Sequence, residues 1–290
     1  MLRSMTTLAV SSLGAVCFSG PATAAEDVVL SNLATWNGSP VDQAVAMDTY
    51  ELVVNQLGLA ISNKPMAPGE TLGVFGFDVG LSSTVAFIDT KDGSSGQPSP
   101  WARVNETGEP NAVMWIPWLS ARKGLPLSLE IGGNLGYIAF SRQTIFSGYG
   151  RWGLWEGYHP IPDLSIQVGY SGYVGNSELE LGALDYSATL GYTLPFGSLV
   201  GINQAQFSPY LGVGQVIVHA APRIDEDLQQ ELGIGRVSGF KKGEGYTDAL
   251  RHLALSGGFR VLSGDVQLRM AVQFAPGQLT SINGGLGFVY

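Results

Sequence analysis

After residue 69 the apolar period changes from that of a helix to two, and the resulting run of alternating segments limits the fold more than any other feature. Side chains alternate across a strand, so such a segment has one apolar face and one polar face. Between 126 and 139 the apolar face reads Leu127, Leu129, Ile131, Gly133, Leu135 and Tyr137. The sequence therefore predicts an all-β, antiparallel fold for this part of the chain.

The polar faces of these segments consist mainly of Gly, Ser, Asn and Gln, with few charges. A soluble β-sandwich has the same period of two, but its solvent-facing residues are usually Lys, Glu, Thr and Arg. Small polar residues suit the narrow interior of a closed barrel, whose outer face contacts lipid. We predict a transmembrane β-barrel and keep a secreted sandwich as the alternative.

Several larger polar residues are expected to face the lumen of this barrel, where they would control what passes. Each lies on the polar face of a predicted strand. These lumen candidates are Asp78, Glu130, Asn134, Gln167, Arg260 and Arg269.

The segment 70–290 has room for about 10 to 12 strands if each tilted strand takes roughly 10 residues. Long connections are expected at 89–111 and 221–247, which are rich in charged residues and glycine. The expected strands are 72–88, 112–122, 126–141, 145–157, 163–175, 178–193, 206–219, 248–262, 265–275 and 279–290.

The last predicted strand ends on Phe288 and Tyr290, two aromatic residues on one face. In outer-membrane barrels the final strand pairs with the first, and a terminal aromatic resembles the signal that the barrel-assembly machinery reads. We expect Phe288 and Tyr290 to act as this assembly signal. The expected partners are the assembly machinery, periplasmic chaperones and outer-membrane lipid.

Residues 1–24 have the pattern of a secretory signal peptide: Arg3, then an apolar stretch, then the small residues Ala22 and Ala24 around Thr23. Cys17 follows Val16, which does not suit a lipoprotein cleavage site, so cleavage after Ala24 is expected. The mature chain would then contain no cysteine for a disulfide or a thiolate metal site. We predict export to the bacterial outer membrane.

The chain has few charges for its length. Charged residues account for 13% of the sequence, against about 25% in typical globular proteins. The net charge is −9, and no basic patch stands out. Nucleic-acid binding is therefore not expected.

The segment 25–69 precedes the predicted barrel and contains one amphipathic helix at 41–61, with apolar residues at intervals of three and four. Lys64 and Pro65 end it. The helix could plug the lumen, form a periplasmic flap, or pack on the sheet as ordinary core.

No grouping for catalysis or metal binding stands out. None of the three histidines, His159, His219 and His252, has a serine two positions later. His252 and Ser256 share a face of their strand but lie about 13 Å apart, too far for proton transfer, and only a partner on another strand could complete such a pair. The acidic run Asp225-Glu226-Asp227 lacks the order of a calcium loop and is expected to be solvated. We predict no enzyme activity, cofactor or metal.

Many aromatic residues are expected near strand ends, where they would form girdles at the membrane interfaces. They would serve equally well as core fillers. They include Trp115, Trp118, Tyr149, Trp152, Trp155, Tyr158, Tyr170, Tyr173, Tyr192 and Tyr210.

Three stretches carry a family resemblance: 64–80, with Lys-Pro-Met-Ala-Pro-Gly-Glu at its start, 123–126 and 209–214. They resemble an uncharacterised family of proteobacterial outer-membrane barrels with a short N-terminal helix. The resemblance implies the barrel fold and brings no catalytic residue. The chain lacks the Asn-Pro-Ala hatch of the hydrophobe-uptake channels.

Two classes of function follow from these patterns. The first is a narrow or plugged channel or transporter for small or hydrophobic solutes, with the 41–61 helix as a movable plug. The second is a non-conducting structural or adhesive barrel that presents its surface loops. A lipid-modifying barrel enzyme is a third, more distant alternative.

Overall fold

The computed structural model describes residues 27–36, 39–91, 98–141, 143–157, 161–196 and 205–290. The predicted signal peptide, 1–24, lies outside the described residues, as do His159 and Tyr158.

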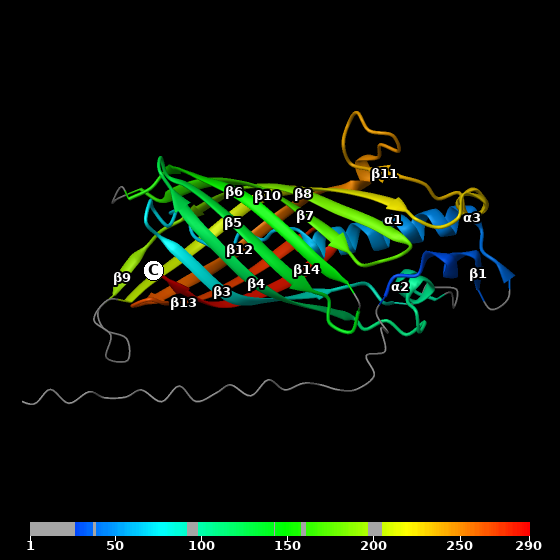
Figure 1. The fold of residues 1–290 in the computed structure, drawn as a ribbon, viewed down its shortest axis with the longest axis horizontal. Helices are drawn as coiled ribbons and strands as arrows, with labels where there is room; N and C mark the ends of the chain where they lie inside the picture. Colours follow the sequence, from blue (N-terminus) through cyan, green and yellow to red (C-terminus); the bar gives the residue numbers. More distant parts are fainter. Residues whose placement is uncertain (1–26, 37–38, 92–97, 142, 158–160, 197–204) are drawn as a thin grey trace, which may run out of the picture.

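Ten long antiparallel strands form one closed barrel (Figure 1). Each strand pairs with the strands before and after it in sequence, and β14 pairs with β3. The predicted barrel is confirmed, and a two-sheet sandwich is excluded. The strands are β3 (Phe77–Phe87), β4 (Val113–Leu125), β5 (Leu129–Tyr137), β6 (Thr144–Trp155), β7 (Asp163–Val174), β8 (Leu179–Gly191), β10 (Ala205–Pro222), β12 (Arg251–Ser263), β13 (Val266–Ala275) and β14 (Leu279–Val289).

Two predicted strands begin later than expected because the chain turns where the period of two alone predicts extended backbone. Residues 72–76 form a turn with Gly73 at φ 71°, so β3 begins at Phe77. Leu127 and Ser128 have φ values of 65° and 56° and make the tight turn before β5. Positive φ at such positions is compatible with a turn and not with a strand.

The pairing of β14 with β3 closes the sheet. It extends from Thr280 opposite Phe87 to Val289 opposite Asp78. Two further backbone bonds, 2.8 and 2.7 Å long, join Phe77 and Tyr290 in both directions. A closed sheet has no unpaired edge, which is the condition for crossing lipid with strands. Phe288 and Tyr290 are exposed at this seam, and their role as an assembly signal stays a prediction.

The alternation assigns the two faces of the wall as the sequence predicts. In β13, Leu268, Met270 and Val272 are exposed on the outside, whereas Gln267 and Arg269 are buried inside. The same division holds along β3, β5 and β7. The outer surface of the barrel is therefore an apolar band that suits acyl chains.

The two ends of the barrel differ in their connections. The longest, 88–112 and 223–250, both lie at one end, hereafter the long-loop end. The opposite end, hereafter the turn end, has the tight turns 126–128 and 264–265, and the last residue lies there (Figure 1). Two short strands, β9 (Leu194–Phe196) and β11 (Val237–Ser238), pair with parts of β10.

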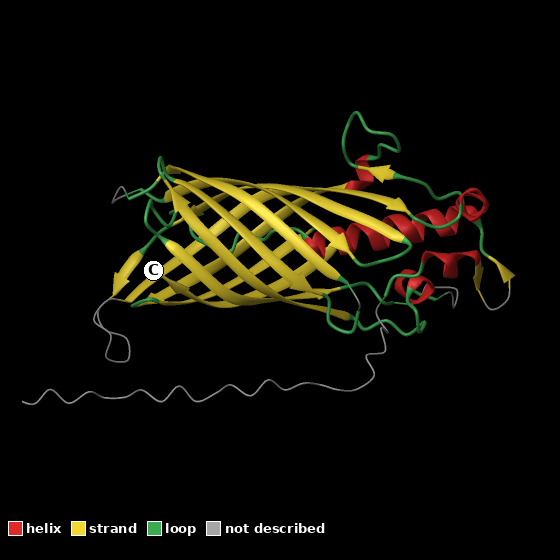
Figure 2. Cartoon of the chain, in the orientation of Figure 1, coloured by secondary structure: helices red, strands yellow, loops and turns green. Residues whose placement is uncertain are grey.

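The helices gather at the long-loop end, and one of them enters the barrel (Figure 2). That helix is α1 (Gln43–Ile61), where the sequence predicts a helix at 41–61. The Asp42 carboxylate caps it by accepting from the backbone N–H of Ala44, at 2.9 Å. The remaining short elements are η1 (Leu30–Ala34), β1 (Thr35–Trp36), β2 (Ser39–Pro40), α2 (Pro100–Val104), α3 (Glu226–Leu232) and η2 (Asp248–Leu250).

None of the described helices has the length and apolar character needed to span a membrane.

The aromatic residues divide between the two faces of the wall. Trp115, Trp152, Trp155, Tyr170 and Tyr192 are exposed, as interfacial residues would be. The girdle prediction is wrong for four others, because their strand positions face inward. These are Trp118, Tyr173 and Tyr210, which are buried, and Tyr149, which lines a cavity inside the barrel.

We predict that Met270→Arg destabilises the barrel in lipid vesicles. Met270 is exposed on the outer face in the middle of β13, where a charge would enter hydrocarbon. The expected loss is about 2–4 kcal/mol in the free energy of unfolding, measured by urea titration. The control is Phe140→Arg, at an exposed position in the 138–143 connection, which should change little. Equal effects of the two changes would contradict a lipid-facing β13.

Candidate functional site: the filled lumen

The half of the lumen next to the long-loop end has an apolar core built around α1. The helix contacts β7, β8, β10 and β14. Its buried side chains Val53, Leu57 and Ile61 belong to one cluster with inward-facing wall residues, including Ile116 and Ile145. Each such side chain contributes about 1.5–3 kcal/mol when it leaves water. Helix and wall are therefore packed together like the core of a soluble protein.

Gly58 allows the close approach of α1 to β10. A Cβ atom at this position would lie 2.5 Å from Cγ2 of Val218, well inside van der Waals contact. A larger residue would push the helix away from the wall.

Two amides on α1 bind the rim of the long-loop end. The side-chain oxygen of Asn55 lies 2.7 Å from Nε2 of His252, and its Nδ2 donates to Ala249 O at 3.0 Å. Gln56 donates to Gln278 O at 3.0 Å and accepts from the indole N–H of Trp101 at 2.7 Å. These bonds satisfy polar groups that α1 buries, so they fix the depth of the helix in the barrel.

The helix ends inside the lumen, where Lys64 caps it. Its Nζ donates to the carbonyl oxygens of Leu59, Ala60 and Ser62 at 2.6–2.8 Å. These carbonyls lie at the negative end of the helix dipole, where a cation is favourable, and the Leu59 oxygen also accepts from the Ser62 hydroxyl at 3.0 Å. The ammonium group thus replaces water at a buried helix end.

After α1 the chain continues through the lumen to the turn end as the segment 62–73, hereafter the crossing segment. Near its start, the Asn63 side chain donates to Asp185 at 3.0 Å and accepts from Asn134 at 3.1 Å. Near its end, Thr71 N donates to Glu156 at 2.8 Å, and Leu72 N donates to Glu130 at 3.2 Å.

Four arginines from the wall surround the crossing segment. Arg122 pairs with Asp78 and, at 3.5 Å, with Glu130; Arg269 pairs with Asp78 at 3.5 Å. Arg260 pairs with Glu70, which belongs to the crossing segment. Arg151 donates to the backbone oxygens of Ala67 and Pro68 and to Ser165 Oγ. The wall therefore holds the crossing segment by charge as well as by shape.

A cavity of about 50 Å³ remains between the crossing segment and the wall. Four of its lining residues are cationic, and no acidic residue lines it in the part of the chain that the structure describes. The cationic residues are Lys64, Arg122, Arg151 and Arg269. The volume suits a few water molecules.

The structure places the six lumen candidates inside the barrel. Asp78, Glu130 and Arg269 lie together around Arg122, and Arg260 lies at Glu70. Asn134 binds Asn63, and Gln167 lines the cavity.

Sequence reasoning missed the partners Arg122, Arg151 and Asp185. All three lie on the inward faces of their strands, so the alternation of faces could have found them. The alternation carries no signal for Asn63, Lys64 or Glu70, because these residues precede the strands.

The two described histidines make polar contacts on opposite faces of the wall. His252 faces the lumen and binds Asn55, whereas His219 lies on the outer wall, 3.0 Å from the Tyr170 hydroxyl. Among the described residues, no three His, Cys, Asp or Glu side chains are grouped to hold a metal ion. The absence of enzyme activity stays a prediction.

We predict that Asp78→Asn strongly destabilises the barrel, because Arg122 and Arg269 would keep buried charges with less compensation. Loss of one partner from a buried pair costs about 3–5 kcal/mol. Urea unfolding in detergent micelles measures this loss. Glu180→Gln is the matched control, since it breaks an ion pair with Arg223 in which both side chains are more than half exposed. That change should cost about 1 kcal/mol or less. Similar losses in both variants would show that the lumen network contributes no more than a surface pair.

No protein-family model matches the chain, and no curated protein matches it either. Solved structures similar to it include Omp33 from Acinetobacter baumannii, with 10% identity, coverage of 74% of this chain and 98% of that one, and a TM-score of 0.28. Neisserial surface protein A has 12% identity, coverage of 73% and 95%, and a TM-score of 0.26. Ail from Yersinia pestis has 9% identity, coverage of 74% and 97%, and a TM-score of 0.25.

These values are too low to carry an argument about function. The assignment rests instead on the closed antiparallel wall, its apolar outer band and its filled interior. The protein is a closed, ten-stranded antiparallel β-barrel whose apolar outer face suits a membrane.

Proposed function

We propose that the protein is a non-conducting barrel that anchors the elements of its long-loop end in the outer membrane, as a structural or adhesive scaffold. The observation that carries this proposal is the filled lumen. α1 enters it from the long-loop end, the crossing segment continues through it to the turn end (Figure 2), and the cavity beside the crossing segment measures only about 50 Å³.

The nature of the lumen wall around α1 supports a permanent closure. Inward-facing Ile116, Ile145 and Val218 are buried in the same apolar cluster as α1, and Val218 lies directly against Gly58 of the helix. If α1 left, this apolar wall would face water at a cost of about 25 cal/mol for each Å². Water-filled barrels instead have polar interiors.

Between the described strands of the wall, backbone pairing leaves no side exit for hydrophobic solutes. Neighbouring strands pair over most of their lengths, including the β14–β3 seam. The one register shift among the long strands of the described wall is between Gly153 and Trp155 on β6. A hydrophobic solute leaving sideways would have to break several backbone hydrogen bonds at once.

The elements at the long-loop end form a compact cap that a scaffold could present. Ser31 binds the Glu178 carboxylate through its backbone N–H, at 2.8 Å, and its hydroxyl, at 2.9 Å. Val29 N donates to Val104 O at 2.7 Å. Leu30, Leu33, Trp101 and Leu232 are buried beneath these bonds. In barrels of this class the long loops face outward and the short turns face the periplasm, so this cap would lie on the cell surface.

A gated channel for small anions is the second candidate. The cavity beside the crossing segment has a cationic lining, and rings of Arg or Lys select anions in other pores. This function would require both the crossing segment and α1 to move.

A disulfide between α1 and β10 separates the two candidates. In Gly58→Cys/Val218→Cys the two Cβ atoms would start about 3.1 Å apart, slightly closer than in a relaxed disulfide, so a small shift allows the bond. The mature chain predicted from the sequence has no other cysteine. We expect no discrete conductance in planar bilayers from wild type or from this variant, oxidised or reduced.

Val218→Cys alone is the control for the substitution itself. Openings in wild type that vanish in the oxidised pair and return on reduction would contradict the scaffold and support the gated channel.

The orientation has its own test. We predict that a membrane-impermeant maleimide labels Glu231→Cys on intact cells and does not label Pro126→Cys. Both positions are exposed, the first on α3 at the long-loop end and the second in a tight turn at the turn end. Labelling of Pro126→Cys and not of Glu231→Cys would show that the barrel has the opposite orientation, with the turn end on the cell surface. Lysed cells serve as the control, where both variants should react.

A further inference from the structure

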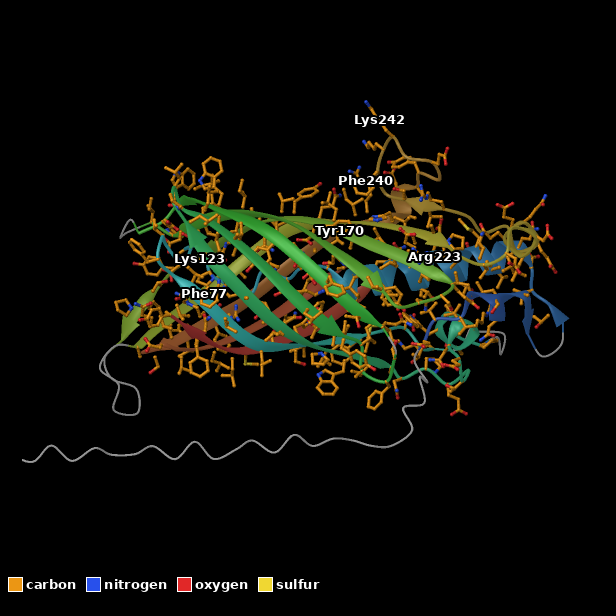
Figure 3. All side chains as sticks on the ribbon, in the orientation of Figure 1. Phe77, Lys123, Tyr170, Arg223, Phe240 and Lys242 are labelled. Atoms are coloured by element: carbon orange, nitrogen blue, oxygen red, sulfur yellow. The ribbon has the colours of Figure 1, made fainter. Side chains whose placement is uncertain are left out.

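One loop at the long-loop end leaves the barrel wall sideways. β11 continues the wall beside β10, and Gly239 N donates to Val218 O at 2.9 Å. The chain then makes a short excursion, 240–246, before Thr247 N returns to Ser238 O at 3.0 Å. Phe240 and Lys242 lie on this excursion, outside the wall and away from the barrel axis (Figure 3). We call residues 239–247 the side loop.

Aromatic contacts hold the side loop on the outer face of the wall. The rings of Phe240 and His219 lie 5.7 Å apart, and Nε2 of His219 lies 3.0 Å from the Tyr170 hydroxyl. Tyr170 reaches His219 across Gly182, where a Cβ atom would collide with both side chains. Three neighbouring strands, β7, β8 and β10, therefore build the seat of this loop.

The side loop lies at the boundary of the apolar band. Along β7 the outer face runs Ile166, Val168, Tyr170 and, after Gly172, Val174 towards the long-loop end, and these four side chains are exposed. Two residues beyond Gly182 on β8, in the same direction, Glu180 forms an exposed ion pair with Arg223 at 2.8 Å. Exposed charge thus appears on the outer face close to the last apolar residue of β7, and lipid headgroups lie where apolar and charged side chains meet.

The side loop and its base carry a local excess of positive charge in an acidic protein. Residues 236–251 contain four basic residues, Arg236, Lys241, Lys242 and Arg251, and two acidic ones, Glu244 and Asp248. Within the described chain, none of the four basic residues forms an ion pair, whereas Arg223 nearby does.

Arg251 lies under the loop on the outer face. A Cβ atom on Gly239 would be 3.0 Å from Cγ of Arg251. Arg251 is paired in register with Ile217 of β10. Its Nε is buried and, among the described residues, has no hydrogen-bond partner. The same holds for Nδ1 of His219. Two unused polar nitrogens therefore lie at the foot of a cationic loop.

We propose that the side loop and the wall beneath it bind the phosphate group of a membrane lipid, with Lys241, Lys242 and Arg251 as the cationic contacts. The acyl chains of that lipid would lie along the apolar band below Tyr170 and Phe240. Basic side chains at headgroup level attract anionic lipids, and long side chains reach the headgroups from the protein surface. This site does not depend on whether the lumen conducts.

Lipid retention on the purified full chain tests the site. Protein in detergent micelles is mixed with equal amounts of phosphatidic acid and phosphatidylcholine, and the lipid that stays bound is measured by native mass spectrometry. We expect wild type to retain phosphatidic acid in preference. A basic residue near a membrane surface adds roughly a factor of five in anionic-lipid binding, so Lys241→Gln/Lys242→Gln should lower retention about 25-fold. Arg251→Gln should lower it further.

Lys91→Gln is the matched control, since Lys91 is an exposed lysine in the 88–112 connection, away from the side loop in sequence. It should retain lipid like wild type. Heat-modifiable migration on gels verifies that each variant is folded. Equal retention by wild type and the double lysine variant would overturn the proposal. So would displacement of the lipid by inorganic phosphate alone, because the site would then recognise a free anion.

Discussion

The closed hydrogen-bonded wall is the constraint on which the rest of the structure depends. Hydrocarbon offers no partner for a backbone N–H or C=O, so a sheet can cross it only if every edge is paired. The β14–β3 seam meets this condition, with Phe77 and Tyr290 completing it at the turn end. Closure then dictates the alternation, because one face of each strand must contact lipid and the other must enclose an interior that has to be filled.

The interior is filled in two different ways. Near the long-loop end α1 and the wall exclude water by apolar packing, with Gly58 against Val218 as the closest approach. Towards the turn end the crossing segment is held by charged groups from the wall. Arg260 binds Glu70, and Arg151 binds backbone oxygens at Ala67 and Pro68. Each arginine there is expensive to bury alone, so the network is stable only while the crossing segment stays in place. We therefore expect α1, the crossing segment and the wall to fold together as one unit.

The outer surface divides along the barrel axis as well. Its middle is apolar, whereas the long-loop end carries the compact cap and the side loop with its unpaired cations. A barrel without an open lumen interacts with its surroundings through such surfaces. The proposed scaffold role and the proposed lipid site are compatible for this reason, because the first concerns what the cap presents and the second concerns the lipid around the barrel.

The sequence by itself determined the strands, their inward and outward faces, and the position of α1 to within two residues, because a period of two or of 3.6 is a local property of the chain. It also placed the six lumen candidates, since the polar face of a barrel strand points inward. Only the tertiary structure decided that α1 enters the barrel, that Lys64 caps it there, and that Arg122 and Arg151 face the crossing segment. These contacts join residues far apart in sequence, and no local period records them. Only the tertiary structure also decided that Trp118, Tyr173 and Tyr210 face inward. An aromatic residue near a strand end suits a membrane interface or a core equally well, and only its spatial neighbours settle which of the two it occupies.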